Sequence, residues 1–508
     1  MKPVLWITVA LLLWEGLGFL NPGSVLIPRP SGIAAYLYQN AGLIMRGAIA
    51  TSHNALWGFF WGNAAAVVLA ALAVAVPRSE RALSALSLLV FCLPLVATGP
   101  ILRVLYGPGD GPQITLAALA VCYTTYLSLL VGLRAMPQSW EDLIATYGRG
   151  AWTVLTVVRA RASLPYLFAG LQIAAPAAFL GAMIGEFTGA ERGLGVLTLR
   201  AMRGLEVNAT WALAVTAAGL AMAFYALVGW TARRTVGYAP VILLRAPGQA
   251  HILPLWKKLL ALFVMVTGIL ALWQISMDAF GLSRFFAKRP LDVWMYLRTD
   301  AQARATLLAA LGETLRMTIP GYLAGLLLGA LLAAVVILLP KLDRGVMLVA
   351  VALRAIPIIT TAPLLVLALG RGAVGTIAII AVMIFFPTLI ACLQGLRQTP
   401  GQIVDVFNSY GAGRLRLLFS ARIPAMLPAF FASARMAVPA ALLAVTTTEW
   451  LATGKGIGVL MALTASTSNY NMLWSSVVVL SLAAVIGYAL VAWIERAVLR
   501  VYASEQVI

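Results

Sequence analysis

Long apolar runs recur along the chain, and they restrict its fold more than any other feature of the sequence. A continuous run of about 20 apolar residues can cross the hydrocarbon core of a bilayer as a helix, whereas the strands of a membrane barrel alternate in polarity over about ten residues. With 62% hydrophobic and 10% charged residues, the 508-residue chain has too few polar side chains to cover a water-soluble globule. The sequence therefore predicts an all-α, polytopic membrane protein embedded in a lipid bilayer.

The chain also contains an internal repeat with an offset of 263 residues. Without a gap, this offset pairs Tyr147-Gly148 with Tyr410-Gly411 and Glu186 with Glu449. A register kept over such a length indicates a duplication. We therefore expect two homologous halves, residues 1–240 and 257–508, joined by a cytoplasmic linker at 241–256.

Six hydrophobic helices are expected in each half, which gives about 12 transmembrane helices. Because six is an even number, both halves begin on the same side of the membrane, and the two six-helix repeats are parallel. The predicted spans lie near 4–20, 48–76, 83–105, 113–133, 166–189 and 209–231, and near 258–277, 312–339, 346–369, 374–394, 429–451 and 473–495.

Lysine and arginine residues indicate the orientation. A formal net charge of +19 first suggests a nucleic-acid partner, but the basic residues lie in short connections without a basic stripe or a groove-reading motif, so we reject nucleic acid. Twenty of them lie in the connections on the side of both termini and twelve on the opposite side. The positive-inside bias therefore predicts a multi-pass protein of the inner membrane with both termini in the cytoplasm, although the outer connection 278–310 carries five basic residues.

Two cytoplasmic loops, at 134–165 and 397–428, are longer than a connection between neighbouring spans requires. In each loop a helical run ends at a Tyr-Gly pair, where we expect the glycine to adopt the dihedral angles that end a helix. The prolines that follow, Pro165 and Pro428, are expected to start the next span, where a missing backbone donor costs little. A docking element for another protein is the favoured interpretation of each loop, and a solvated hairpin is the alternative.

The loops share a motif: an acidic residue, five further residues and a glycine, then a basic and apolar segment that ends in proline. This motif, Asp142 to Gly148 and Asp405 to Gly411 with Pro424 thirteen residues later, resembles the EAA loop of ABC-importer permeases. The segments "GEFTGAERGLGVL" and "TEWLATGKGIGVL" are similar to those of the permeases for nitrate, sulfonate, taurine and bicarbonate. The resemblance implies the type I ABC-importer permease fold, with two permease units fused in one chain.

The resemblance also implies partners and an activity. Each loop would dock a short coupling helix on one of two ABC ATPase subunits, and an extracytoplasmic solute-binding protein would deliver the solute. The chain would then be the permease subunit of an ATP-driven importer that moves a small solute, such as nitrate, a sulfonate, taurine or bicarbonate, inward by alternating access. The same machine with another solute, such as a thiamine precursor or ferric ion, is one alternative, and an ion-driven secondary transporter is another.

The sequence contains no motif for nucleotide binding, catalysis or metal binding. There is no GxxxxGK[ST] phosphate loop, no catalytic constellation and no metal-ligand spacing, so we expect a transport subunit that is not an enzyme. We also expect no cofactor in this chain, with ATP and Mg bound by the partner ATPase.

Polar residues inside a span are costly in lipid and are expected to face the bundle interior. Glu186 and Glu449 lie near the outer ends of the two fifth spans, either at an outer gate or as caps of the loop amides that follow. Gln172 and Arg435 are equivalent residues near the inner ends of the same spans. The fifth spans are therefore expected to line the pathway between the halves.

The third spans carry a second set of candidate pathway residues. Thr98 in one half, and Thr361 in the other, lie close before a proline, and we expect them to interrupt the helix and expose backbone groups to the pathway. Arg354 has no basic counterpart in the first half, which suggests an anion path biased to the second half.

Overall fold

In the computed structural model, every regular element of the described residues is helical. The described residues are 12, 14–16, 18–19, 28–134, 142, 144, 146–148, 150–204, 206–236, 255–342, 345–346 and 372–502. The helices of the first half are α2 (Pro30–Gln39), α3 (Ala41–Ala75), α4 (Glu80–Cys92), α5 (Leu95–Tyr106), α6 (Gly111–Arg134), α8 (Ala151–Thr153), η1 (Val154–Arg159), α9 (Ala160–Phe187), α10 (Leu194–Arg203) and α11 (Val207–Thr235).

The second half repeats this order, and the predicted linker at 241–256 falls almost entirely outside the described residues. Here η2 is a 3-10 turn, and η1, η3 and η4 are π-helical turns. The helices are α12 (Leu255–Ala279), α13 (Pro290–Thr299), α14 (Ala301–Leu338), η2 (Pro340–Leu342), α17 (Ala373–Arg397), α18 (Gly401–Ser409), α19 (Arg414–Leu417), η3 (Leu418–Arg422), α20 (Ile423–Thr448), η4 (Glu449–Thr453), α21 (Ile457–Ser466) and α22 (Tyr470–Tyr502).

Eight described helices are long and apolar enough to cross a membrane, and they confirm the predicted all-α polytopic fold. In lipid the backbone must satisfy its own hydrogen bonds, which is why such runs become helices. The eight are the second, fourth, fifth and sixth predicted spans of each half: α3, α6, η1–α9 and α11, and α14, α17, α19–α20 and α22. Helix α12 is shorter in its apolar part (Phe263–Ala279), and the spans predicted at 4–20 and 346–369 fall largely outside the described residues.

The repeat is visible in the packing as well as in the helix bounds. Helix α21 begins and ends 263 residues after α10, and α22 begins 263 residues after α11. In each half a tryptophan of the N-terminal segment contacts a tryptophan of the last span with ring centroids 5.4 Å apart: Trp14 is tilted against Trp211, and Trp273 stacks on Trp474. The two halves therefore share their internal contacts.

Glycines let the second and fourth spans approach closely. A Cβ added at Gly58 would collide with Ala117, and one added at the equivalent Gly321 would lie 2.7 Å from Cβ of Ile380. Close helix approach through small residues is the usual source of packing energy within a membrane, where lipid offers no hydrophobic gain to helix association.

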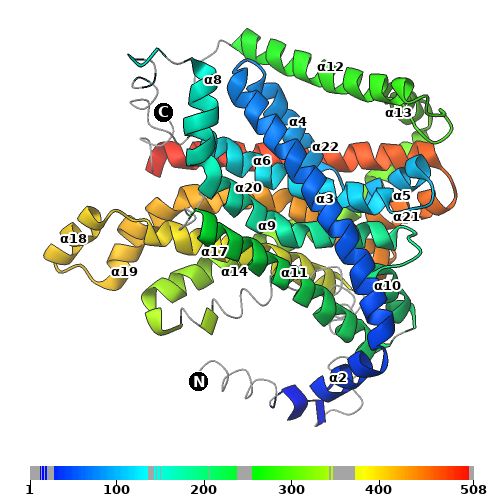
Figure 1. Ribbon diagram of the computed structural model, residues 1–508, viewed down its shortest axis with the longest axis horizontal. Coiled ribbons are helices and arrows are strands. Elements are labelled where there is room, and N and C mark those ends of the chain that lie inside the picture. Colours follow the sequence, from blue (N-terminus) through cyan, green and yellow to red (C-terminus); the bar gives the residue numbers. More distant parts are fainter. Residues whose placement is uncertain are drawn as a thin grey trace.

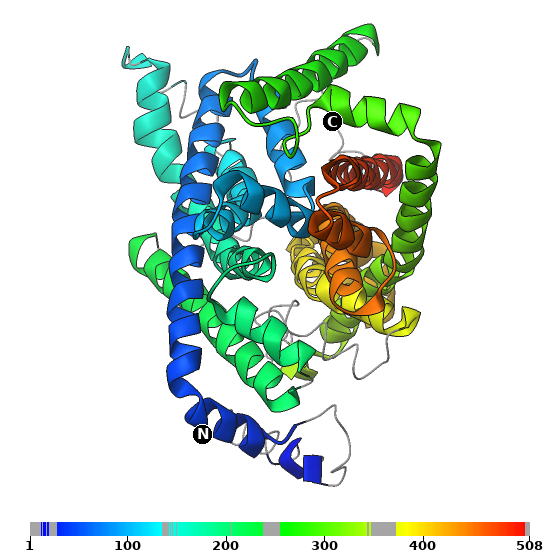
Figure 2. The same ribbon diagram turned by 90° about the vertical axis from the view of Figure 1, so that its right-hand side faces the viewer.

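Figure 1 shows how the elements divide between the two ends of the bundle. Helices α8, α18 and α19 project at the left-hand end, which we call the loop end, while α5, α10, α13 and α21 gather at the opposite end. Viewed from that opposite end in Figure 2, the first half lies on one side and the second half on the other. Both long loops therefore lie at the same end of the bundle, as their predicted equivalence requires.

The interface between the halves is formed by α4 and α5 against α20, α21 and α22. Cys92 and Ile101 of the first half belong to the same buried cluster as Leu442 and Leu473 of the second. At the end opposite the loops, Phe187 and Trp450 bring their rings to 6.3 Å in an edge-on contact.

The third span of the first half is broken, but the predicted position of the break was wrong. Helix α4 ends at Cys92 and α5 begins at Leu95, because Leu93 precedes Pro94 and is forced into an extended conformation (φ −65°, ψ 131°). Thr98 lies inside α5, where its hydroxyl donates to the Pro94 carbonyl at 2.9 Å. Its predicted counterpart Thr361, and the separate candidate Arg354, lie outside the described residues.

The prediction that Pro165 and Pro428 start the fifth spans was also wrong. Both prolines lie inside helices, α9 and α20, which continue without a break from the π-helical turns η1 and η3. These turns end 263 residues apart, at Arg159 and Arg422, so they belong to the repeat. A π turn accommodates an extra residue and shifts the hydrogen-bond pattern, and this allows the chain to enter the span as one helix despite its prolines.

Candidate functional site

Each long loop contains a glycine in the left-handed region. Gly148 has φ +68° and Gly411 has φ +67°, so the predicted helix-ending role of both glycines is confirmed. A Cβ added at either position would meet no atom within 4 Å. The surrounding space would therefore admit a larger residue. Glycine is required at both positions because of the positive φ of the backbone.

The loop of the second half presents apolar side chains at the loop end. Asp405 is exposed on α18, and the nearby Val406 and Tyr410 are 54% and 87% exposed. In the first half Asp142 is exposed and helical, and Tyr147, the equivalent of Tyr410, is 78% exposed. Apolar groups gathered beyond the end of a bundle are typical of a docking surface.

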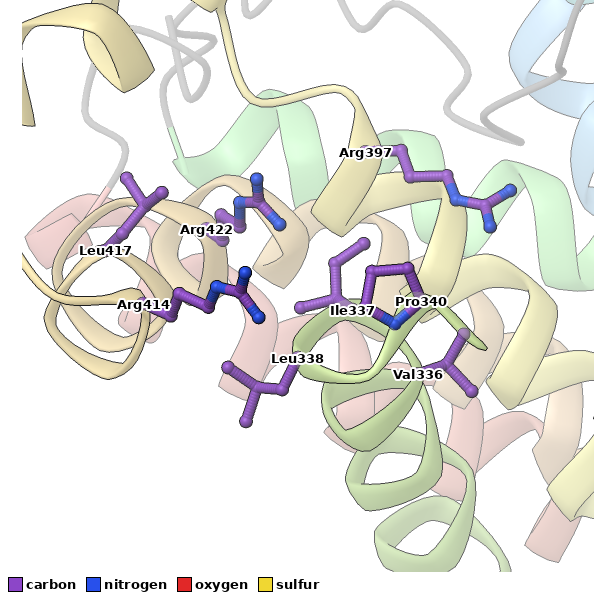
Figure 3. Close-up of a pocket in the computed structure, with 8 residues that line it drawn as sticks. All are labelled: Val336, Ile337, Leu338, Pro340, Arg397, Arg414, Leu417 and Arg422. Carbon is purple, nitrogen blue, oxygen red and sulfur yellow. The ribbon is translucent and has the colours of Figure 1, made fainter. Parts of the chain in front are cut away.

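A basic cavity of about 350 Å³ lies behind the second loop. It is lined by Arg397 of α17, Arg414 of α19 and Arg422 of η3, and by the end of α14. In Figure 3, Arg414 and Arg422 extend toward Ile337 and Leu338, and Arg397 lies on the other side of Pro340. Pro424 follows this cluster as the second residue of α20.

Glu186 is buried at the end opposite the loops, where it holds three elements together. Its Oε1 accepts a hydrogen bond from the Thr51 hydroxyl of α3 at 2.7 Å, and its Oε2 accepts one from the amide of Gly195 at 2.6 Å. The Thr51 hydroxyl also accepts the amide of Leu194 at 2.8 Å. The carboxylate and the hydroxyl thus satisfy the first amides of α10, which no intrahelical acceptor reaches.

Glu449 makes the same contacts in the second half. Its Oε1 accepts from Thr314 of α14 at 2.8 Å and its Oε2 from the amide of Gly458 at 2.8 Å, while Thr314 accepts the amide of Ile457 at 2.9 Å. We call each set of contacts an outer clamp: Thr51, Glu186 and the start of α10 in one half, and Thr314, Glu449 and the start of α21 in the other.

The clamps also explain two glycines. Gly193 and Gly456 have φ +138° and +96°, and a Cβ at either would collide with the carboxylate of Glu186 or Glu449. Of the two interpretations offered by the sequence, the contacts are those of a cap, and a role at the gate stays a prediction. Sequence reasoning missed the threonines, although both precede their glutamates by 135 residues.

Arg435 and Gln172 lie in different surroundings despite their equivalent positions. Nε of Arg435 lies 3.1 Å from Oε2 of Glu495 on α22, in an ion pair that sequence reasoning did not anticipate. Arg435 lies within the continuous helix Arg414–Thr448, and its position near the inner end of the span stays a prediction. Gln172 packs against Gly229 of α11 within its own half.

Among the described residues, no group of three or more His, Cys, Asp and Glu side chains is arranged to hold a metal ion. The polar chemistry of the site therefore consists of the two outer clamps, the Arg435–Glu495 pair and the basic groups at the loop end.

Comparison with known proteins finds the same family twice in this chain. Residues 62–237 and 325–500 each match the family described as "Binding-protein-dependent transport system inner membrane component". The two matched segments start and end 263 residues apart, which is the offset of the repeat, and together they cover more than half of the chain.

Individual relatives correspond to one half of the chain. A probable ABC transporter permease protein of Haemophilus influenzae is 30% identical over 227 residues, which are 44% of this chain and 90% of the relative. The formylaminopyrimidine transport permease protein of Halalkalibacterium halodurans is 26% identical over 46% of this chain and 91% of its own length. The riboflavin transport system permease protein of Chloroflexus aurantiacus is 26% identical over 46% of this chain and 90% of its own length. Other relatives are named as sulfonate, bicarbonate and nitrate permeases.

Proposed function

Since the chain belongs to the family of binding-protein-dependent transport system inner membrane components, we propose that it forms both permease halves of an ATP-driven importer. Two ABC ATPase subunits would bind the loops that contain Gly148 and Gly411, and an extracytoplasmic binding protein would deliver a small solute to the opposite end. The loop end is then the cytoplasmic end, as the distribution of lysine and arginine predicts.

One observation supports this proposal above the others: two exposed, glycine-ended loops lie at one end of the bundle (Figure 1). Fusion of the halves gives each ATPase subunit its own loop on the same chain. A solvated hairpin would not need equal backbone angles at Gly148 and Gly411, nor exposed apolar residues beside them.

The fifth span of the second half is suited to carry motion across the membrane. It runs as one helix from Arg414 in the loop to Thr448, beside the outer clamp at Glu449. Closure of the ATPase subunits would displace the loop, and the clamp would tie the far end of the helix to α14 and α21. The halves would then rock between outward and inward forms as rigid bodies, which is alternating access.

The solute belongs to the range of small molecules named for the relatives. Nitrate, bicarbonate, aliphatic sulfonates, riboflavin and formylaminopyrimidine are the solutes in the names of the matched permeases. The sequence motifs favour the anionic members of this set, and a thiamine precursor is the second candidate.

The proposal is tested by co-expression with candidate ATPase subunits and the binding protein, followed by purification and reconstitution in vesicles. The expected result is a complex that contains the ATPase and takes up solute only when ATP is supplied. Uptake that follows an ion gradient and needs no ATP would instead identify a secondary transporter, and absence of any bound ATPase would remove the basis of the proposal.

A further inference from the structure

A cavity of about 200 Å³ lies between the two halves and takes its polar lining from both. The first half contributes Ser84 of α4 with Tyr123 and Tyr126 of α6, and the second contributes Arg435 of α20 and Tyr488 of α22. The lining residues belong to α4, α6, α20 and α22, so the cavity lies between helices of the two halves. This is where a solute would sit between outward and inward forms.

The polar groups of the cavity are preorganised. The hydroxyl groups of Ser84 and Tyr126 are 2.7 Å apart, and Tyr123 and Tyr488 line the same cavity from opposite halves. The ring of Phe91 stacks on that of Tyr123 with centroids 4.7 Å apart, and this contact holds the Tyr123 ring in place.

Arg435 keeps donors for a ligand. Its guanidinium carbon lies 5.8 Å from the ring centroid of Tyr488. Its Nε is close to the Glu495 carboxylate, yet the direction of the N–H bond misses that carboxylate, and Nε has no hydrogen-bond partner among the described residues. Arg435 is partly buried and Glu495 is buried, and the pair places a cation beside an anion.

A comparison of the two halves shows whether the fold requires the polar groups of the cavity. At the equivalent positions, Tyr123 and Tyr126 are replaced by Phe386 and Leu389. The ion pair is replaced in the first half by Gln172 and Ala232. One half thus forms the same helices without these groups, so the shared architecture does not require them.

We propose that this cavity binds the transported solute and that the solute is a small planar heterocycle carrying both hydrogen-bond acceptors and donors. This inference rests on the proposed function, and among its candidate solutes it chooses the heterocycles over the anions that the sequence motifs favour. The tyrosine rings offer faces and edges to a flat ring, the guanidinium of Arg435 donates to ring nitrogen or carbonyl atoms, and the hydroxyl oxygens of the lining accept from an amino group.

Size and charge support a heterocycle over the inorganic anions. The volume is below the roughly 300–1,000 Å³ of sites for drug-sized ligands, so a molecule of one or two rings fits. Nitrate and bicarbonate are small enough to leave most of this volume unfilled. Glu495 would repel any anion that approached Arg435, and an aliphatic sulfonate would leave the tyrosine faces without a flat partner.

The test uses the complete transporter, the chain with its ATPase and binding protein, in vesicles. ATP-dependent uptake is measured for formylaminopyrimidine and cytosine as planar probes, and for nitrate and taurine as the alternatives. We expect uptake of a planar probe. Absence of uptake for both planar probes overturns the inference, whatever the other two solutes do.

A double variant tests where the solute binds. The double change Arg435→Gln with Glu495→Ala installs the residues of the first half and removes both charges together, so that no unpaired charge is left buried. We expect it to raise the KM for the planar solute by about tenfold or more, because hydrogen bonds to charged groups are among the stronger ones.

A milder pair of variants controls for folding. Tyr488→Phe removes a hydroxyl in the cavity, whereas Tyr225→Phe removes the equivalent hydroxyl of the other half. Tyr488→Phe should raise the KM several-fold, and Tyr225→Phe should leave the KM unchanged. Equal KM values for Tyr488→Phe, the double variant and the wild type would show that the solute binds elsewhere. The proposed function is judged separately, by the bound ATPase and by ATP-dependent uptake of any of the four solutes.

Discussion

At the scale of single residues, the outer clamps show how a carboxylate is tolerated within the bundle. Glu186 and Glu449 are 1% and 3% exposed, and each accepts one hydroxyl and one amide. A buried carboxyl group is stable only when hydrogen-bond partners such as these satisfy its oxygens. The threonine of each clamp is therefore as important as the glutamate.

Thr314→Val should destabilise the protein. The change keeps the shape of the side chain but leaves an oxygen of Glu449 and the amide of Ile457 without a partner, at a cost of about 1–3 kcal/mol. Thermal unfolding of the purified protein in nanodiscs measures the loss, and Thr306→Val on the exposed face of the same helix is the control. If both variants unfold at the wild-type temperature, the clamp does not stabilise the fold.

At the scale of elements, the second loop combines a helix end, a turn and a π-helical entry into the span. Gly411 needs its positive φ of +67°, whereas Gly413 two residues later has φ −65°, an angle that proline also adopts. The two glycines therefore make a matched pair for testing the loop.

Gly411→Pro should abolish coupling, because proline cannot adopt a positive φ and the turn that presents α18 would be displaced. Gly413→Pro should retain most of the ATP-dependent uptake. Both variants are compared with the wild type in reconstituted vesicles, with the amount of inserted protein determined for each. Normal uptake by Gly411→Pro would count against a coupling role of this loop.

At the scale of the whole molecule, transport by two motor subunits requires both loops on one side of the membrane. Cysteine labelling tests this, because the three native cysteines, Cys92, Cys122 and Cys392, are buried. In whole cells, an impermeant thiol reagent should react with Thr467→Cys and with neither Gly150→Cys nor Gly413→Cys. In inside-out vesicles the pattern should reverse. Labelling of positions 150 and 413 from opposite sides would contradict the proposed scheme.

Some of the architecture could be predicted from the sequence because it depends on local properties. Apolar runs must become helices in lipid, and a duplicated sequence must fold twice in the same way, so eight of the predicted spans and the repeat are confirmed. Gly148 and Gly411 were also predicted correctly, since the turn that ends their helices needs a residue without a side chain.

Other features depended on contacts that the sequence does not reveal. The break at Pro94 could not be told from one at Pro100, because packing decides which proline a helix absorbs. The π turns before Pro165 and Pro428 were missed for the same reason.

By itself, the sequence determined the class of the protein, its duplicated plan and the positions of its loops, since each follows from hydrophobicity or from repetition along the chain. Only the tertiary structure decided that Glu186 and Glu449 cap helices, and that Arg435 meets Glu495 beside three tyrosines. Those contacts join residues far apart in the chain, and their geometry is fixed only when the helices pack.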